Sequence, residues 1–176
     1  DLVLLTTADE AKKVQGVICY DRASGELEWM TKVNEGGFAA RIHNKNTHAS
    51  PSLAFDGERL FAVFNNHDGA QLVALGMDGT LLWKKKAAAF VPNKYKFGYA
   101  PSPLIYKETV IVSSEYDGEG SSIAAFDRET GGEVWRTPRP RMTSYSSPII
   151  AHVAERDQLL ISGCGKTTSY DPANGK

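Results

Sequence analysis

The sequence predicts an all-β protein, a β-propeller segment whose radial blades each hold four short strands. Three observations predict this fold. A segment ending in tryptophan recurs along the chain, a serine–proline segment precedes the later copies, and short apolar runs bounded by turn residues lie between the two. Repeats of about 40 to 50 residues are typical of propeller blades. With 176 residues, the chain is long enough for one domain with a sizeable core.

The first repeated segment joins an aspartate, a glycine four residues later and a tryptophan four residues after that, and its clearest copy runs from Asp127 to Trp135. The aspartate can accept hydrogen bonds from N–H groups of a turn between the third and fourth strands, and the glycine supplies a positive φ. The tryptophan is expected to wedge between neighbouring blades. Ten residues are therefore assigned to the architecture of the repeat: Asp21, Gly25, Trp29, Gly79, Trp83, Asp127, Gly131, Trp135, Asp171 and Gly175.

The serine–proline segments at 50–55, 101–106 and 146–151 mark the start of a first strand, since proline is tolerated at the first residue of a strand. The apolar runs that follow them predict the second strand of each blade. One propeller segment is thus expected over 1–176. Its blades are expected at about 1–29, 49–83, 100–135 and 146–176, and the first and last of these are partial.

The first repeat begins at its second strand, and the last repeat ends before its fourth. These two partial blades cannot complete one shared four-stranded blade. We therefore expect that the remainder of the propeller belongs to a longer polypeptide or is supplied by a partner.

The Asp-x-x-Thr-Gly-x-x-x-Trp pattern at 127–135 resembles the tryptophan-docking repeat of propellers like those that bind pyrroloquinoline quinone (PQQ). That PQQ-like family includes quinoprotein alcohol dehydrogenases and the BamB lipoprotein of the outer-membrane β-barrel assembly machinery. The resemblance covers nearly the whole chain. The sequence departs from the pattern at the shortened turn 76–79 and in lacking the final tryptophan. It implies a larger ring of about eight blades and an extracytoplasmic location, periplasmic or secreted.

Quinoproteins of this family carry two adjacent cysteines, with acidic and amide residues that hold calcium and the quinone. This chain has two distant cysteines, Cys19 and Cys164. We therefore assign no cofactor, and PQQ with calcium is not supported by this segment. Neither a metal-binding histidine spacing nor a G-x-S-x-G nucleophile motif is present, so no metal or catalytic residue is assigned.

Positive charge gathers where the fourth strand of one blade leads to the first strand of the next, in the segments 30–48, 84–99 and 136–145. These segments hold one acid, Glu35, and eleven basic residues: Lys32, Arg41, Lys45, Lys84, Lys85, Lys86, Lys94, Lys96, Arg136, Arg139 and Arg141. Their net charge is therefore +10, although the whole chain carries −1. The same segments hold the aromatic residues Phe38, Phe90, Tyr95, Phe97, Tyr99 and Tyr145.

A basic face that bears aromatic residues suits a protein, a peptide or an anionic glycan, whereas no motif for nucleic acid accompanies the charge. The sequence thus predicts a non-enzymatic binding scaffold, and a membrane-associated assembly is among its expected partners. The candidate face comprises Arg41, Lys94, Tyr95, Lys96, Arg139, Arg141 and Tyr145. The alternative is a segment of a quinoprotein dehydrogenase whose active site lies outside this chain. Changing Lys94, Lys96, Arg139 and Arg141 to glutamate is expected to leave folding intact and to weaken ligand capture.

Overall fold

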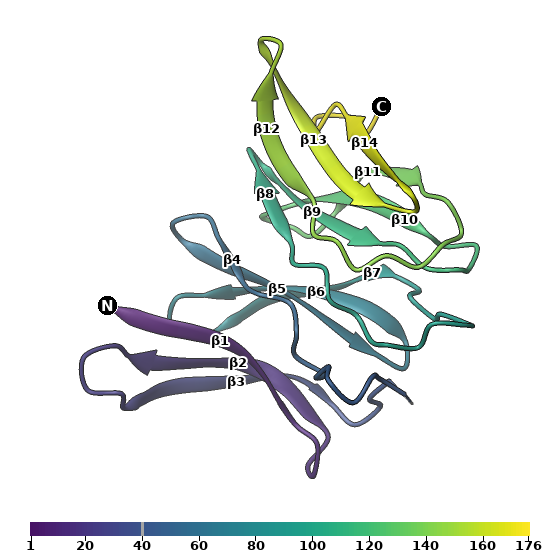
Figure 1. Ribbon diagram of the computed structural model, residues 1–176. Coiled ribbons are helices and arrows are strands. Elements are labelled where there is room, and N and C mark those ends of the chain that lie inside the picture. Colours follow the sequence, from purple (N-terminus) through teal and green to yellow (C-terminus); the bar gives the residue numbers. More distant parts are fainter. Residues whose placement is uncertain (40) are drawn as a thin grey trace.

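A computed structural model describes residues 1–39 and 41–176. Within this described part the chain forms four antiparallel sheets, and none of its segments is a helix long and apolar enough to cross a membrane. Figure 1 shows the sheets following one another in chain order, from the purple N-terminal sheet to the yellow C-terminal one. The first sheet contains β1 (Leu2–Asp9), β2 (Val14–Asp21) and β3 (Leu27–Glu35).

The second and third sheets have four strands each. The second contains β4 (Ala54–Phe55), β5 (Arg59–Asn66), β6 (Gly69–Gly76) and β7 (Leu81–Ala88). The third contains β8 (Leu104–Tyr106), β9 (Thr109–Ser114), β10 (Ser122–Asp127) and β11 (Glu133–Pro138). The fourth sheet contains β12 (Ile149–Val153), β13 (Arg156–Gly163) and β14 (Lys166–Tyr170).

The core lies between the sheets. One cluster, which includes Phe61 and Val112, joins the second sheet to the third, and separate clusters join the first sheet to the second and the third to the fourth. The two middle sheets are therefore covered on both faces. For this reason β6 has seven buried residues out of eight and reads as a continuous apolar run instead of an alternating one.

Each tryptophan docks onto the next sheet. Its indole N–H donates to a backbone carbonyl in the turn that follows the third strand of the repeat. The pairs are Trp29 with Met77 at 3.1 Å, Trp83 with Arg128 at 3.2 Å, and Trp135 with Pro172 at 3.1 Å. A buried tryptophan contributes a large apolar area, and its N–H requires a partner when it is buried. One side chain therefore supplies both packing and a directed contact between sheets.

The turn glycine lies against the tryptophan ring of the preceding sheet. A Cβ atom on Gly131 would stand 2.8 Å from a ring carbon of Trp83, and the same relation holds at Gly79 with Trp29 and at Gly175 with Trp135. Gly131 also has a φ of 69°, which disfavours other residues. Two independent constraints thus require glycine at this position of the repeat.

The aspartate of the repeat holds the same turn together. Asp127 accepts hydrogen bonds from the backbone N–H of Thr130 at 2.8 Å and from its hydroxyl at 2.7 Å. Asp21 makes the equivalent contacts with Ser24. These hydrogen bonds favour the ionised carboxylate, and they lower the pKa of both aspartates.

Two further contacts between sheets have no counterpart in the sequence analysis. The basic residue after the tryptophan reaches back to the preceding sheet: Lys84 Nζ donates to the Val33 carbonyl at 2.9 Å, and Arg136 Nη2 donates to the Ala87 carbonyl at 2.8 Å. Just before the first strands, backbone N–H groups donate to the hydroxyl of the serine that precedes the first strand of the next sheet: Ser52 to Ser102 and Ser102 to Ser147, both at 2.9 Å.

The limits of the fourth strands differ from those expected from the sequence. The fourth strands continue past their tryptophans to Glu35, Ala88 and Pro138, because the residues after the indole still pair with the neighbouring strand. Lys84 and Arg136 are thus strand residues that brace two sheets. They do not belong to the connecting segments in which the sequence analysis places them.

Candidate binding surface

Three links connect the last strand of one sheet to the next sheet: 36–53, 89–103 and 139–148. They contain no acidic residue and six basic ones, Arg41, Lys45, Lys94, Lys96, Arg139 and Arg141. Their net charge is +6, less than the +10 expected from the sequence, because five basic residues and the acidic Glu35 belong to strands.

The first two links are tied to each other. The Phe97 carbonyl accepts hydrogen bonds from the backbone N–H of His43 at 3.2 Å and from the side-chain amide of Asn46 at 2.6 Å. The second link is also anchored by Asp117, whose two carboxylate oxygens accept the N–H groups of Asn93 and Lys94, each at 2.8 Å. These hydrogen bonds lower the pKa of Asp117. Residues distant in sequence therefore form one surface.

An exposed aromatic cluster crosses all three links. Phe97 lies at its centre, with ring centroids 5.2 Å from His43, 5.9 Å from Tyr95 and 6.3 Å from Tyr145. Tyr145 also donates its hydroxyl hydrogen to the Tyr95 carbonyl at 3.3 Å. Phe97 is 44% exposed and Tyr95 is 55% exposed, so their faces are accessible to a partner. Phe90 and Tyr99, by contrast, are buried in the core.

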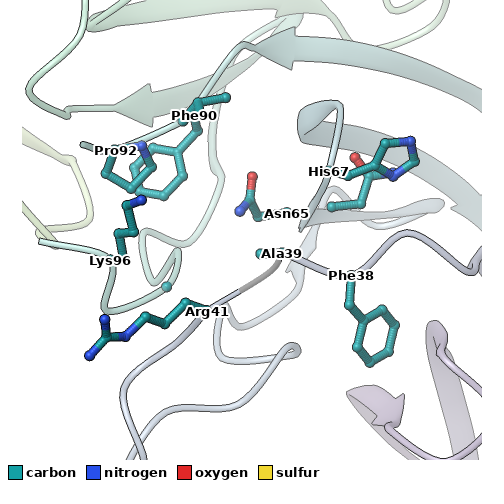
Figure 2. A pocket seen from close by; sticks show the side chains of 11 residues that line it. Phe38, Ala39, Arg41, Asn65, His67, Phe90, Pro92 and Lys96 are labelled. Carbon is teal, nitrogen blue, oxygen red and sulfur yellow. The ribbon is translucent and has the colours of Figure 1, made fainter. Parts of the chain in front are cut away.

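Three neighbouring hollows open on this surface. The first, of about 330 Å³, is lined by Phe38, Phe90, Val91, Arg41 and Lys96 among others, and Figure 2 shows its labelled side chains. Arg41 and Lys96 also line the second hollow, of about 420 Å³. Phe97 is shared between the second hollow and a shallower third one of about 290 Å³. We call this region the link surface, defined by Arg41, His43, Lys45, Lys94, Tyr95, Lys96, Phe97 and Tyr145.

Arg139 is placed differently from the sequence expectation. Its side chain is 1% exposed, and its Nε–H donates to Glu115, which is equally buried, at 2.5 Å. Its Nη1 donates to the hydroxyl groups of Thr168 at 2.9 Å and Tyr170 at 2.6 Å. Arg139 therefore braces the third and fourth sheets, and it is not available to a partner. A glutamate here would meet Glu115 inside the protein, so the expectation of intact folding is wrong for this position.

The remaining expected residues are exposed, but they differ in how far neighbours compensate their charge. Arg141 Nη2 lies 3.2 Å from Glu119 Oε1, and the charge of Lys94 is close enough to Asp117 to help lower the pKa of that carboxyl group. Arg41 and Lys96 form no ion pair within the described part of the chain. The uncompensated positive charge is thus concentrated on the first two links, beside the aromatic cluster.

The residues present do not fit a quinone site. Cys19 is buried in β2, whereas Cys164 follows β13, so the two thiols belong to different sheets. The acidic Glu115 is engaged with Arg139, and among the described residues no group of three or more histidine, cysteine or acidic side chains is arranged to hold a metal ion. The link surface instead brings cationic side chains and exposed aromatic rings together.

Solved structures share this fold. BamB from Moraxella catarrhalis is 17% identical, with a TM-score of 0.56 over 96% of this chain and 49% of its own. Quinohemoprotein alcohol dehydrogenase from Comamonas testosteroni is 17% identical, with a TM-score of 0.59 over 100% of this chain and 36% of its own. A europium-containing methanol dehydrogenase is 23% identical, with a TM-score of 0.50 over 77% of this chain and 23% of its own.

The chain thus spans less than half the length of each of these proteins, and at such identities the likeness concerns the fold alone. No curated protein sequence matches it significantly. The family comparison is more specific, because residues 13–176 match the profile described as outer membrane protein assembly factor BamB. Given this match over nearly the entire chain, the protein belongs to the BamB-like family of PQQ-like β-propeller repeats.

Proposed function

We propose that this chain is a non-enzymatic binding module whose link surface captures an acidic segment of a protein or peptide, or an anionic glycan. One observation carries the proposal: Arg41 and Lys96 line two hollows beside the exposed ring of Phe97, and neither forms an ion pair within the described part of the chain. Cations without internal partners attract carboxylate or sulfate groups, and exposed aromatic rings are enriched where proteins bind one another.

The proposal includes the setting of the module. The four sheets would form part of a larger propeller of about eight blades, and the protein would act outside the cytoplasm, in an assembly associated with a membrane. Membership of the BamB-like family supports this setting, as does the coverage of 49% of the Moraxella catarrhalis protein.

A binding experiment with two fluorescein-labelled probes, octaglutamate and a sulfated heparin octasaccharide, tests the proposal. Fluorescence anisotropy at low ionic strength should detect at least one of them. The double variant Arg41→Glu, Lys96→Glu should bind that probe roughly tenfold more weakly or worse, because both attractions become repulsions.

The matched control is Arg22→Glu with Arg156→Glu. It changes the net charge equally, but at exposed residues at the other ends of the strands: Arg22 follows β2, and Arg156 begins β13. This control should bind nearly as well as the unchanged protein. Equal losses in the two double variants would show that net charge, and not the link surface, controls binding. The proposal would be overturned if neither probe bound the unchanged protein.

A further inference from the structure

The hollow of about 330 Å³ has an unusual lining for a surface so rich in cations. Phe38, Phe90, Val91 and Pro92 form apolar walls, while Arg41 and Lys96 carry its positive charge. Figure 2 shows these two cations on one side of the hollow and Phe38 on the other, with Asn65 between them. The volume lies at the small end of ligand pockets, which span roughly 300–1,000 Å³. It suits one apolar side chain better than an extended cofactor.

Two groups in the lining lack a partner among the described residues: an apolar side chain that stays exposed and a polar atom that accepts no hydrogen bond. Val91 is 59% exposed, although it forms part of an apolar wall. The side-chain Oδ1 of Asn65 is shielded from solvent, yet it accepts no hydrogen bond within the described part of the chain. Buried polar atoms nearly always have a partner, so the hollow offers an unpaired acceptor to a donor on a bound segment.

Together these features select among the partners allowed by the proposed function, on which this inference rests. A sulfated glycan would match the cations but would leave the apolar walls uncovered. A polypeptide can cover the walls with a side chain, donate a main-chain N–H to the orphaned amide oxygen, and place carboxylates at the rim.

We propose that this hollow is the anchor site for an aromatic or large aliphatic side chain within an acidic polypeptide segment. The side chain packs against Phe38, Phe90 and Val91. The main chain of the segment donates a hydrogen bond to Asn65, and its flanking carboxylates pair with Arg41 and Lys96. The link surface thereby recognises an acidic sequence with one apolar residue at a fixed place.

Two labelled nonapeptides test the anchor: Asp-Glu-Asp-Glu-Phe-Glu-Asp-Glu-Asp, and the same peptide with serine in place of phenylalanine. Their charges are equal, so a difference in affinity reports the central side chain alone. The phenylalanine peptide should bind about ten- to a hundredfold more tightly, as burial of one large apolar side chain predicts. Equal affinity would overturn the anchor.

Variants of the protein test whether the hollow causes the preference for the phenylalanine peptide over the serine peptide. Val91→Ser should remove most of this preference. Val134→Ser should retain the preference, because Val134 is an exposed residue of β11 (53%) that lies outside the hollow. Asn65→Ala should weaken both peptides severalfold without lowering the urea midpoint, because the lost acceptor has no partner in the free protein. A preference unchanged in Val91→Ser, or unchanged affinity in Asn65→Ala, would contradict the proposed contacts.

The outcomes separate this inference from the proposed function. If both peptides bind equally and both lose affinity in the Arg41→Glu, Lys96→Glu variant, the link surface stands and the anchor is overturned. If only the heparin octasaccharide binds, the surface again stands and the polypeptide is the wrong partner. If neither the peptides nor the octasaccharide binds, both proposals are overturned.

Discussion

Replacing Gly131 with alanine tests the docking of tryptophan between sheets, because this residue carries two separable constraints. Its φ of 69° is left-handed, and an alanine there costs about 1–2 kcal/mol. The added Cβ would also stand 2.8 Å from a ring carbon of Trp83, so the indole must move. Such overpacking costs about 1–3 kcal/mol in well-packed interiors. We therefore expect Gly131→Ala to lower the free energy of unfolding by about 2–5 kcal/mol.

Gly25 provides the matched control in the same chain. Its φ is 73°, nearly the same as that of Gly131, but a Cβ at this position would meet no atom within 4 Å. Gly25→Ala should therefore cost only the backbone term of about 1–2 kcal/mol. Urea unfolding followed by circular dichroism measures both variants. Equal destabilisation would refute the claim that the glycine is required by the indole of the preceding sheet.

Three further predictions concern individual contacts. Arg139→Met should destabilise the protein by about 3–5 kcal/mol, since it leaves the buried Glu115 unpaired; Arg141→Met, at an exposed ion pair, should stay within about 0.5 kcal/mol, and similar urea midpoints for the two variants would contradict this. The pKa of Asp127 is lowered from its ordinary value of 3.8, so its contribution to stability is present above that pH and is lost as the pH falls through the folded-state pKa. Asp127→Asn should therefore weaken the acid dependence of the urea midpoint below about pH 4, and an unchanged dependence would argue against the turn contacts. Trp135→Phe should cost about 1–3 kcal/mol by removing the donor to a backbone carbonyl, which thermal unfolding would reveal as a lower midpoint.

The architecture could be predicted from the sequence because its determinants are local and periodic. The spacing from Asp127 to Trp135 is the turn and strand length of one repeat, and its recurrence predicts an all-β fold. The resemblance of the motif indicates the PQQ-like family, and both are confirmed. The strand limits were less accessible. The recognisable motif ends at its tryptophan, but hydrogen bonds to the neighbouring strand continue the fourth strand beyond it.

The binding surface was harder to predict because charge alone does not indicate burial. Arg139 and Arg141 belong to the same link, two residues apart, and nothing in composition separates them. Burial of Arg139 depends on Glu115, which lies 24 residues earlier, and on hydroxyl groups of the following sheet. The involvement of Asn65 was missed for a similar reason. It lies at the end of β5, and only the folded links bring it to the hollow beside Phe90.

The two ends of the strands carry different groups, since the tryptophan contacts lie at one end and the link surface lies at the other. The tryptophan contacts, the turn aspartates and the turn glycines all lie at the turns between the third and fourth strands of each repeat, away from the links. Substitutions at Arg41, Lys96 or Phe97 therefore leave these contacts between sheets untouched. Arg139 is the exception among the basic link residues, because its side chain bonds to Glu115 and to Thr168 and Tyr170 of the fourth sheet. A basic link residue can thus either bond to neighbouring sheets or expose its charge to solvent. The basic residues that carry the proposed function are those whose side chains form no such bonds to the described residues.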